Sequence, residues 1–316
     1  MSTVLSSAAI GAAEEGAEAL PPTGRLRSRS RLVAILFVLP ALLVNLLVIA
    51  GPTVSSVVYS FTDWNGLTAP TFVGLGNWAA LLQDANFWNA IGHNFIYLVI
   101  FLTIPLAMGL GGAFMLSRVR RWAALFRVLF FIPYLLVSVI TAQIWRNILD
   151  PEFGLGAALN GIGIHWLDDV YFFADKQLAL YSVAFVDNWH YWGFLVVLFL
   201  AAMQGIDASQ YEAARIDGAN AWQEFRYIVL PGIRPTLTFA LTVIAIGSLL
   251  VYDYPFVLTN GGPAGASDVA SLLVNRTAFV AHKAGYASAA ALALSVLSGI
   301  LLIFFRILRR GEDDAS

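Results

Sequence analysis

A few polar side chains interrupt the long apolar stretches of this sequence. A polar group inside such a stretch is costly to bury, and it is therefore often functional. Their amide, carboxyl and phenol groups would suit a solute that presents hydroxyls and apolar ring faces. The alternative is hydrogen bonding between helices, which is common in bundles. The positions are Asn45, Asn94, Gln143, Asp187, Asn188, Tyr252, Asp253 and Asn260.

The strongest of these candidates is the run Tyr252-Asp253-Tyr254-Pro255, which breaks an apolar stretch. A helix interrupted by proline beside an acidic group and aromatic rings is typical of a solute site near the middle of a membrane. Asn188, near the outer end of an earlier apolar stretch, is the second candidate. We predict a substrate path formed by Asn188, Tyr252, Asp253, Asn260, Gln143 and Asn94.

The sequence lacks the residues needed for disulfides, metal binding or ATP hydrolysis. The chain has no cysteine, and its four histidines are far apart without HExxH or HxH spacing. We therefore expect no disulfide and no metal site. No GxSxG motif occurs, and no catalytic residue is assigned. Because Asp175 and His282 precede the two lysines, no Gly-Lys pair exists for a phosphate-binding loop, and we expect no ATP hydrolysis by this chain.

The elements that must carry these side chains are membrane helices. Apolar residues make up 59% of the chain and charged residues 12%, against about 45–50% and about 25% in soluble domains. Spanning requires about 20 mostly apolar residues in a helix. We therefore predict an all-α membrane protein with six transmembrane helices. The predicted spans are 32–58, 91–116, 124–147, 178–203, 236–258 and 286–308.

The ends of the chain are polar. Residues 1–24 are rich in Ala, Gly and Glu without an apolar period, which is typical of disorder. The apolar run that follows is longer than a signal-peptide core of about 7–15 residues, so we predict an uncleaved first span. The predicted organisation is a disordered cytoplasmic tail at 1–30, a six-helix domain at 31–310 and a short cytoplasmic tail at 311–316.

Basic residues predict the orientation, because Lys and Arg are retained on the cytoplasmic side. Fourteen of the 18 fall before the first predicted span, in or beside the link between spans two and three, between spans four and five, or at and after the end of the last span. The other side holds Arg146, Lys176, Arg276 and Lys283. Both termini are therefore predicted to be cytoplasmic.

One cytoplasmic loop, 206–235, is more strongly patterned than a simple connection. Ser209 and Glu212 fit a capping box that would start a short helix, and Gly218 would end or bend it. Asn220 can cap a second helix from Ala221 to Leu230. In that helix we expect an apolar face to pack on the membrane domain and two prolines to stop the helix. We expect the apolar face to consist of Trp222, Phe225 and Val229. The helix is expected to end at Pro231 and Pro235.

The predicted surface of this loop is small and flanked by charge, so a groove of another protein could approach it closely. From the residues alone, a docking element and an amphipathic helix lying on the membrane surface remain open. The small residues are Ala213, Ala214, Gly218 and Ala219, and the charged ones are Glu212, Arg215 and Asp217.

The string EAARIDGANAWQEFRYIVLPGIRP in this loop resembles the signature loop of binding-protein-dependent ABC permeases. Further segments resemble the branch that imports carbohydrates and glycerol phosphate: SFTDWNG at 60–66, FVGLGNWAALL at 72–82, the segment 126–154, VLTNGGP at 257–263 and GYASAAALALSV at 285–296. Met203-Gln204-Gly205-Ile206 departs from the more common Leu-Gln-x-Ile.

The resemblance implies the type I ABC importer fold and a location in the bacterial inner membrane. It also implies that Glu212, Ala213, Ala214, Arg215, Asp217, Gly218 and Ala219 couple this chain to an ATPase. The implied partners are two ATPase subunits that hold ATP-Mg, a second permease chain, an extracytoplasmic binding protein and the lipid bilayer. We expect no cofactor on this chain and no nucleic acid. A different small solute, a secondary transporter and an intramembrane enzyme are the alternatives.

Overall fold

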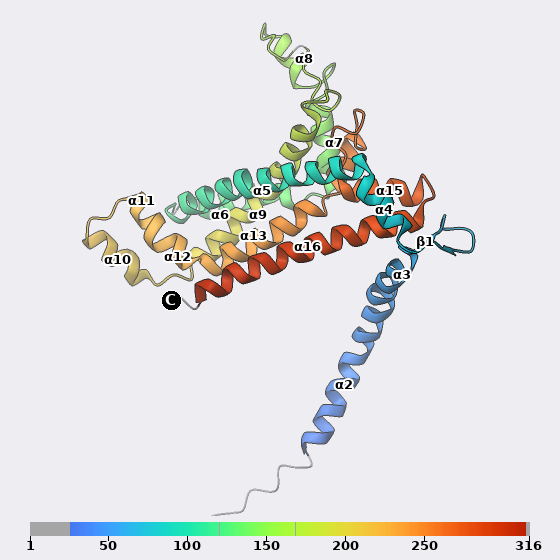
Figure 1. The fold of residues 1–316 in the computed structure, drawn as a ribbon. Helices are drawn as coiled ribbons and strands as arrows, with labels where there is room; N and C mark the ends of the chain where they lie inside the picture. Colours follow the sequence, from blue (N-terminus) through green and yellow to red (C-terminus); the bar gives the residue numbers. More distant parts are fainter. Residues whose placement is uncertain (1–25, 120, 168, 314–316) are drawn as a thin grey trace, which may run out of the picture. The chain divides into compact units, whose positions relative to one another are not determined.

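The computed structural model describes residues 26–119, 121–167 and 169–313 and is almost entirely helical (Figure 1). The chain divides into two compact units, Met1–Ser55 and Ser56–Ser316. The boundary between them falls inside helix α3 (Gly51–Tyr59).

The first unit is one apolar helical run. It comprises α2 (Leu26–Asn45), the π-helical turn η1 (Leu46–Ala50) and the beginning of α3. Apolar side chains between 35 and 49 are exposed around the whole helix, as expected where lipid or another chain covers them. The helix takes in residues 26–30 of the predicted tail, and residues 1–25 of that tail lie outside the described residues.

The second unit contains the other elements of the fold. In chain order, its helices are α4 (Gly76–Gln83), α5 (Ala85–Ser117), α6 (Ala123–Leu135), α7 (Ser138–Ile148), α8 (Leu155–Asn160), α9 (Ala179–Met203), α10 (Ala208–Ile216), α11 (Ala221–Glu224), η2 (Phe225–Val229), α12 (Leu230–Gly232), α13 (Arg234–Leu249), α14 (Asp253–Thr259), α15 (Ala270–Phe279) and α16 (Ala284–Asp313). A two-stranded antiparallel ribbon pairs β1 (Thr62–Asp63) with β2 (Thr71–Phe72).

Four long helices form the body of this unit. Helix α5 packs on α9 and α13, α16 packs on α13 and α15, and α6 packs on α9. In Figure 1, α10 and α11 lie at one end of this body, and α4 and α15 lie at the other. The core includes Tyr97 of α5 and Val183, Leu195 and Phe199 of α9. Helix α9 carries Gly193 where the main chain of α6 approaches it most closely.

The membrane-spanning helices agree with the sequence in part. Four helices are long and apolar enough to span, and the number rises to six if each of two bent pairs counts as one span. The four are Ile35–Tyr59, Ala85–Ser117, Ala179–Met203 and Ala284–Ile307. They match four of the six predicted spans within a few residues.

The third predicted span, 124–147, is not one helix. It is divided into α6 and α7, which meet at an angle of 96°. Leu136 and Val137 are extended at the break. The carbonyl of Leu136 accepts a hydrogen bond from His190 Nε2 of α9 at 3.1 Å, so a backbone group freed by the break is satisfied within the protein.

The fifth predicted span, 236–258, is also interrupted. Helix α13 stops at Leu249, and α14 begins at Asp253. Pro255 is the third residue of α14, where the missing N–H needs no partner within the helix. At its other end, α13 is bent by 75° from the run Ala221–Gly232.

Candidate functional site

The patterned loop 206–235 folds as two short helical segments. Helix α10 begins after Asp207, whose side chain accepts a hydrogen bond from the Ser209 amide at 2.9 Å. This bond lowers the pKa of the Asp207 carboxyl. The predicted capping box of Ser209 and Glu212 is therefore wrong, because the helix starts two residues earlier on a better acceptor.

Helix α10 ends as predicted at Gly218, which has a φ of +76°. The amide of Ala219 donates to the carbonyl of Ala214 at 2.9 Å, and that of Gly218 donates to Arg215 at 3.2 Å. This pair of bonds is the Schellman motif, which needs a left-handed residue after the helix and favours glycine there.

The second segment starts at the predicted cap. Asn220 and Gln223 form a complete capping box. Phe225 packs on Phe114 of α5 with ring centroids 5.1 Å apart, and Val229 is buried. The prediction for Trp222 is wrong, since this side chain is 68% exposed.

The prediction that Pro231 stops this helix is also wrong. The run continues to Gly232, and the bend falls at Ile233. A proline inside a helix collides with the carbonyl four residues before it. The residue four before Pro231 is Tyr227, which lies in the π-helical turn η2 at 225–229, and this turn widens the helix where the carbonyl would collide.

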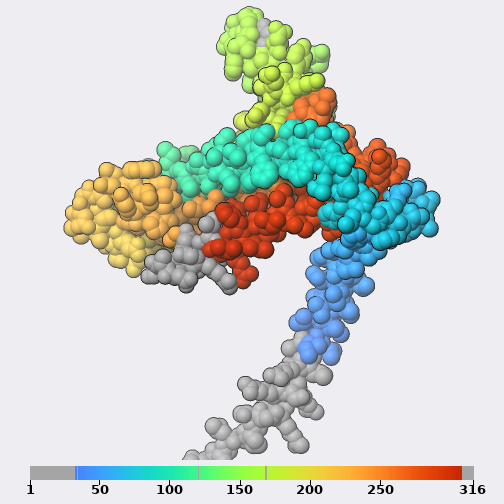
Figure 2. Space-filling model, viewed as in Figure 1, coloured from blue at the N-terminus to red at the C-terminus, as the bar shows by residue number. Residues whose placement is uncertain are grey.

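The surface of α10 has no buried residue in this chain. Even the apolar Ile216 is 87% exposed. A nine-residue helix is marginal in water without caps or packing, so its two caps maintain a helix whose sides are open to contact. All seven predicted coupling residues lie in α10 or the turn after it, and Figure 2 shows the loop, in yellow and orange, projecting from one end of the second unit.

Contacts of Arg118 connect this loop to the membrane helices and form what we call the joint. Arg118, directly after α5, binds Glu224 of α11 at 2.8 Å and lies over the Phe114 ring at 4.4 Å. Behind the joint, a 440 Å³ pocket separates α10 from the ends of α5 and α9. Burial, and to a lesser extent the nearby Glu224 carboxylate, raises the pKa of Tyr211 in this pocket.

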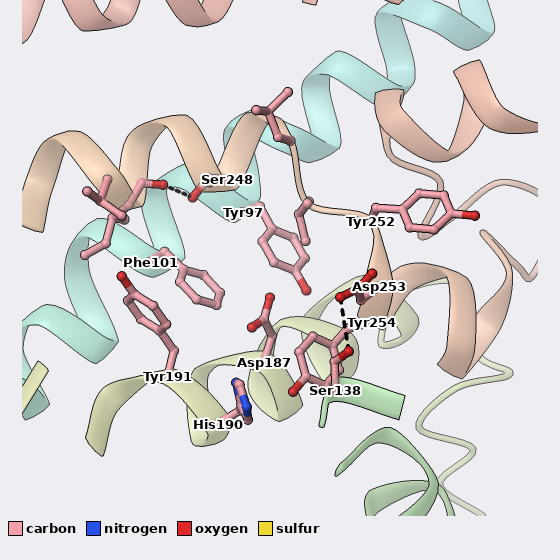
Figure 3. Close-up of a pocket in the computed structure, with 15 residues that line it drawn as sticks. Tyr97, Phe101, Ser138, Asp187, His190, Tyr191, Ser248, Tyr252, Asp253 and Tyr254 are labelled. Carbon is pink, nitrogen blue, oxygen red and sulfur yellow. Dashed lines mark hydrogen bonds between the residues drawn. The ribbon is translucent and has the colours of Figure 1, made fainter. Parts of the chain in front are cut away.

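A second pocket lies among the membrane helices, at the break between α13 and α14 (Figure 3). Its volume is 360 Å³, at the lower end of the range for small-molecule sites. Side chains from α5, α7, α9, α13 and α14 line it. Two of the six predicted path residues, Tyr252 and Asp253, are among them.

Some polar groups of this pocket already form hydrogen bonds within the protein. Ser138 Oγ donates to Asp253 Oδ2 at 3.0 Å. His190 uses Nε2 for the Leu136 carbonyl. Tyr97 is 1% exposed, and its hydroxyl has no hydrogen-bond partner among the described residues. Figure 3 shows this hydroxyl pointing between Asp187 and Asp253. The pocket thus combines aromatic faces with groups that can bond to hydroxyls.

The other four predicted path residues do not line this pocket. Asn94 is fully buried and bridges helix ends by bonds to Ser248, Leu249 and Ala270. Gln143 is exposed and donates to Asn147 at 3.1 Å. Asn188 is buried elsewhere on α9. Asn260 ends α14 with a φ of +49°.

Several lining residues were not in the predicted path, and of these only Asp187 was among the polar candidates in the sequence. Helix α9 contributes Asp187, His190 and Tyr191, and α5 contributes Tyr97. The first three have the spacing i, i+3 and i+4, which places side chains on one helix face. That spacing was the signal in the sequence that could have identified this face.

Comparison with known proteins gives a consistent result. Residues 103–313 match the family described as "Binding-protein-dependent transport system inner membrane component". A probable ABC transporter permease protein of Pyrococcus horikoshii is 32% identical over 272 residues, covering 85% of this chain and 92% of that protein. A probable starch degradation products transport system permease protein of Thermoanaerobacterium thermosulfurigenes is 31% identical, with 85% and 90% covered.

Another relative is the diacetylchitobiose uptake system permease protein of Streptomyces coelicolor, which is 31% identical over 84% of this chain and 79% of that protein. Among solved structures, a chain of a bacterial ABC transporter involved in alginate import superposes with a TM-score of 0.80. The match covers 90% of this chain and 98% of that one at 24% identity. This similarity shows that the fold is that of an ABC importer permease.

Proposed function

This chain belongs to the family of binding-protein-dependent transport system inner membrane components, and from that premise we propose that it is the permease subunit of an ATP-driven ABC importer for a sugar or sugar-like solute. It forms one half of the pore, and a second permease chain forms the other. Two ATPase subunits bind and hydrolyse ATP-Mg on the cytoplasmic side. An extracytoplasmic binding protein delivers the solute, and both termini of this chain are cytoplasmic.

The exposed, doubly capped helix α10 carries this proposal. Tyr211 packs partly on the core, but no residue of α10 is buried among the described parts of this chain and Ile216 is exposed, as expected of a surface that another protein covers. The Arg118–Glu224 ion pair and the Phe114–Phe225 contact fix the following segment to α5. A displacement of α10 by the ATPase would therefore reach the long membrane helices through packed groups.

The transport mechanism that we propose is alternating access. ATP-driven closure of the ATPase pair draws the coupling helices together and opens the path outward, where the binding protein releases its solute. Hydrolysis then restores the inward-facing state. In this cycle Glu212, Ala213, Ala214, Arg215, Asp217, Gly218 and Ala219 form the contact with the ATPase.

The cargo class is supported by the relatives and by the pocket. The names of two relatives refer to starch degradation products and diacetylchitobiose. The pocket at the α13–α14 break offers Tyr252 and Tyr254 beside Asp253, which suits a ligand with both apolar ring faces and hydroxyls. A different small solute is the alternative. A secondary transporter would give the exposed helix α10 no role.

The test replaces Gly218 with phenylalanine in the chain co-expressed with its partner subunits. A side chain there meets no atom within 4 Å in this chain, but it would project into the docking surface. We expect loss of ATPase co-purification, or intact assembly with solute uptake uncoupled from hydrolysis.

Gly163→Phe is the matched control. Its φ is +84°, its surroundings are equally open, and it lies in the outer segment between α8 and α9. Both variants carry a similar backbone cost of about 1–2 kcal/mol. Normal assembly and uptake in Gly218→Phe would refute the docking role. Equal damage in both variants would attribute the loss to backbone strain.

A further inference from the structure

The charged groups of the pocket at the α13–α14 break all have one sign. Asp187 of α9 and Asp253 of α14 contribute two carboxyl groups, and no lysine or arginine is among the lining residues that the structure describes. Figure 3 shows the two carboxyl groups on either side of the Tyr97 hydroxyl. In a space walled by apolar and aromatic side chains, charges of one sign reinforce each other.

The hydrogen-bonding groups of the pocket do not offset the negative charge of its two carboxyl groups. The hydroxyl of Ser138 is already directed at Asp253 Oδ2. His190 donates through Nε2 to the main chain of Leu136. The hydroxyls of Tyr97 and Tyr254 are buried donors of the described lining without a hydrogen-bond partner, and the Tyr97 hydroxyl points between the two carboxyl groups. Both phenols are neutral donors, so they supply no positive charge that could neutralise a carboxylate or a phosphate.

We propose that this pocket selects its solute by charge, admitting neutral or amine-bearing sugars and rejecting acidic sugars and sugar phosphates. The hydroxyl or ammonium groups of an accepted solute donate to Asp187 and Asp253, and the Tyr97 hydroxyl binds a solute oxygen. An anionic solute would meet the two carboxyl groups without a counter-charge, and rejection of the wrong ligand is an effective source of specificity. This inference rests on the proposed function for the claim that solute passes through the pocket.

The complete absence of cysteine from the chain allows a direct measurement. Gly247 lines the pocket, and an added Cβ there would meet no atom within 4 Å. Gly247→Cys therefore places one thiol in the pocket. The variant is assembled with its partner subunits in membranes. It is then treated separately with cationic ethylammonium, neutral hydroxyethyl and anionic ethylsulfonate methanethiosulfonates. Mass spectrometry of this chain gives each modification rate.

Leu67→Cys is the matched control, because this residue is 81% exposed in the ribbon between β1 and β2. Each rate at position 247 is divided by the rate of the same reagent at position 67. We expect the normalised rate of the anionic reagent to be at least tenfold below those of the neutral and cationic reagents. Changing Asp187→Asn and Asp253→Asn together should remove most of that difference.

Equal normalised rates for the three reagents would overturn the proposal, and so would a difference that survives the double substitution. No reaction with any reagent would overturn it too, because the pocket would not be open to solute. Val243→Cys, which also lines the pocket, repeats the measurement in case Gly247→Cys does not assemble. The measurement requires no transport, so its failure is distinguishable from failure of the Gly218 experiment.

Discussion

Replacing Asn94 with alanine should destabilise the fold, although Asn94 does not itself line the pocket at the α13–α14 break. The Asn94 amide nitrogen donates to the carbonyls of Ser248 at 2.8 Å and Leu249 at 3.1 Å, and its oxygen accepts from the Ala270 amide at 2.9 Å. One side chain thus joins the C-terminal end of α13 to the first turn of α15. These are positions where backbone groups have no partner within their own helix.

The size of the effect follows from what the substitution exposes. Three hydrogen bonds are lost at a site that is completely buried, and a typical buried bond contributes about 1 kcal/mol net. The separated carbonyls and the amide are left without a partner, which raises the cost of each loss. We expect a loss of about 3–4 kcal/mol. With about 2 °C per kcal/mol for a chain of this size, the unfolding midpoint should fall by about 6–8 °C.

The measurement is thermal unfolding of the purified protein in detergent with no solute present. Gln143→Ala is the control, since it removes an exposed amide whose partner is Asn147, and an exposed substitution changes stability by less than about 0.5 kcal/mol. If Asn94→Ala unfolded at the wild-type temperature but abolished uptake, the structural reasoning would be refuted and Asn94 would return to the solute path.

Three further substitutions test other contacts. Asn220→Ala removes the cap of α11 and should cost about 1 kcal/mol, seen as faster hydrogen exchange confined to the segment after it; unchanged exchange would contradict the cap. Arg118→Ala and Glu224→Ala should show a coupling of about 0.5–1 kcal/mol in a double-mutant cycle of unfolding, and additivity would mean that the pair does not hold the loop. Gly193→Ala should cost about 3 kcal/mol or prevent folding, because its Cβ would fall 1.7 Å from a carbonyl of α6. Gly247→Ala, with open space around it, is the control for that thermal measurement.

The loop 206–235 was the most predictable part of the chain because its structure is set locally. Gly218 takes a left-handed conformation that disfavours other residues, and Asn220 lies three residues before the Gln223 that completes its capping box. Both signals act within a few positions, so the sequence contains them completely. The starting point of α10 was missed because Asp207 and Ser209 are both good caps, and only the geometry distinguishes them.

The run Tyr252–Pro255 indicated the interruption before α14, but the bend between α6 and α7 could not be predicted in the same way. The 96° break at Leu136 and Val137 has no glycine or proline at the break itself. It is stabilised by His190, 54 residues along the chain, which satisfies the Leu136 carbonyl. Composition therefore located the apolar segments, but it did not show which of them remain straight.

The pocket at the α13–α14 break shows the same limit for single side chains. Asp187 and Asn188 are adjacent, both polar and both inside α9, and polarity alone favoured neither. Consecutive residues of an α-helix point about 100° apart, so at most one of them faces a given neighbour. The choice depends on where α5 and the α13–α14 break lie against α9. Tyr97 of α5 and Asp253 of α14 both line the pocket together with Asp187. The residue that faces this pocket is thus determined by the packing of three distant segments, while the helical spacing of Asp187, His190 and Tyr191 is the part of that information which the sequence carries.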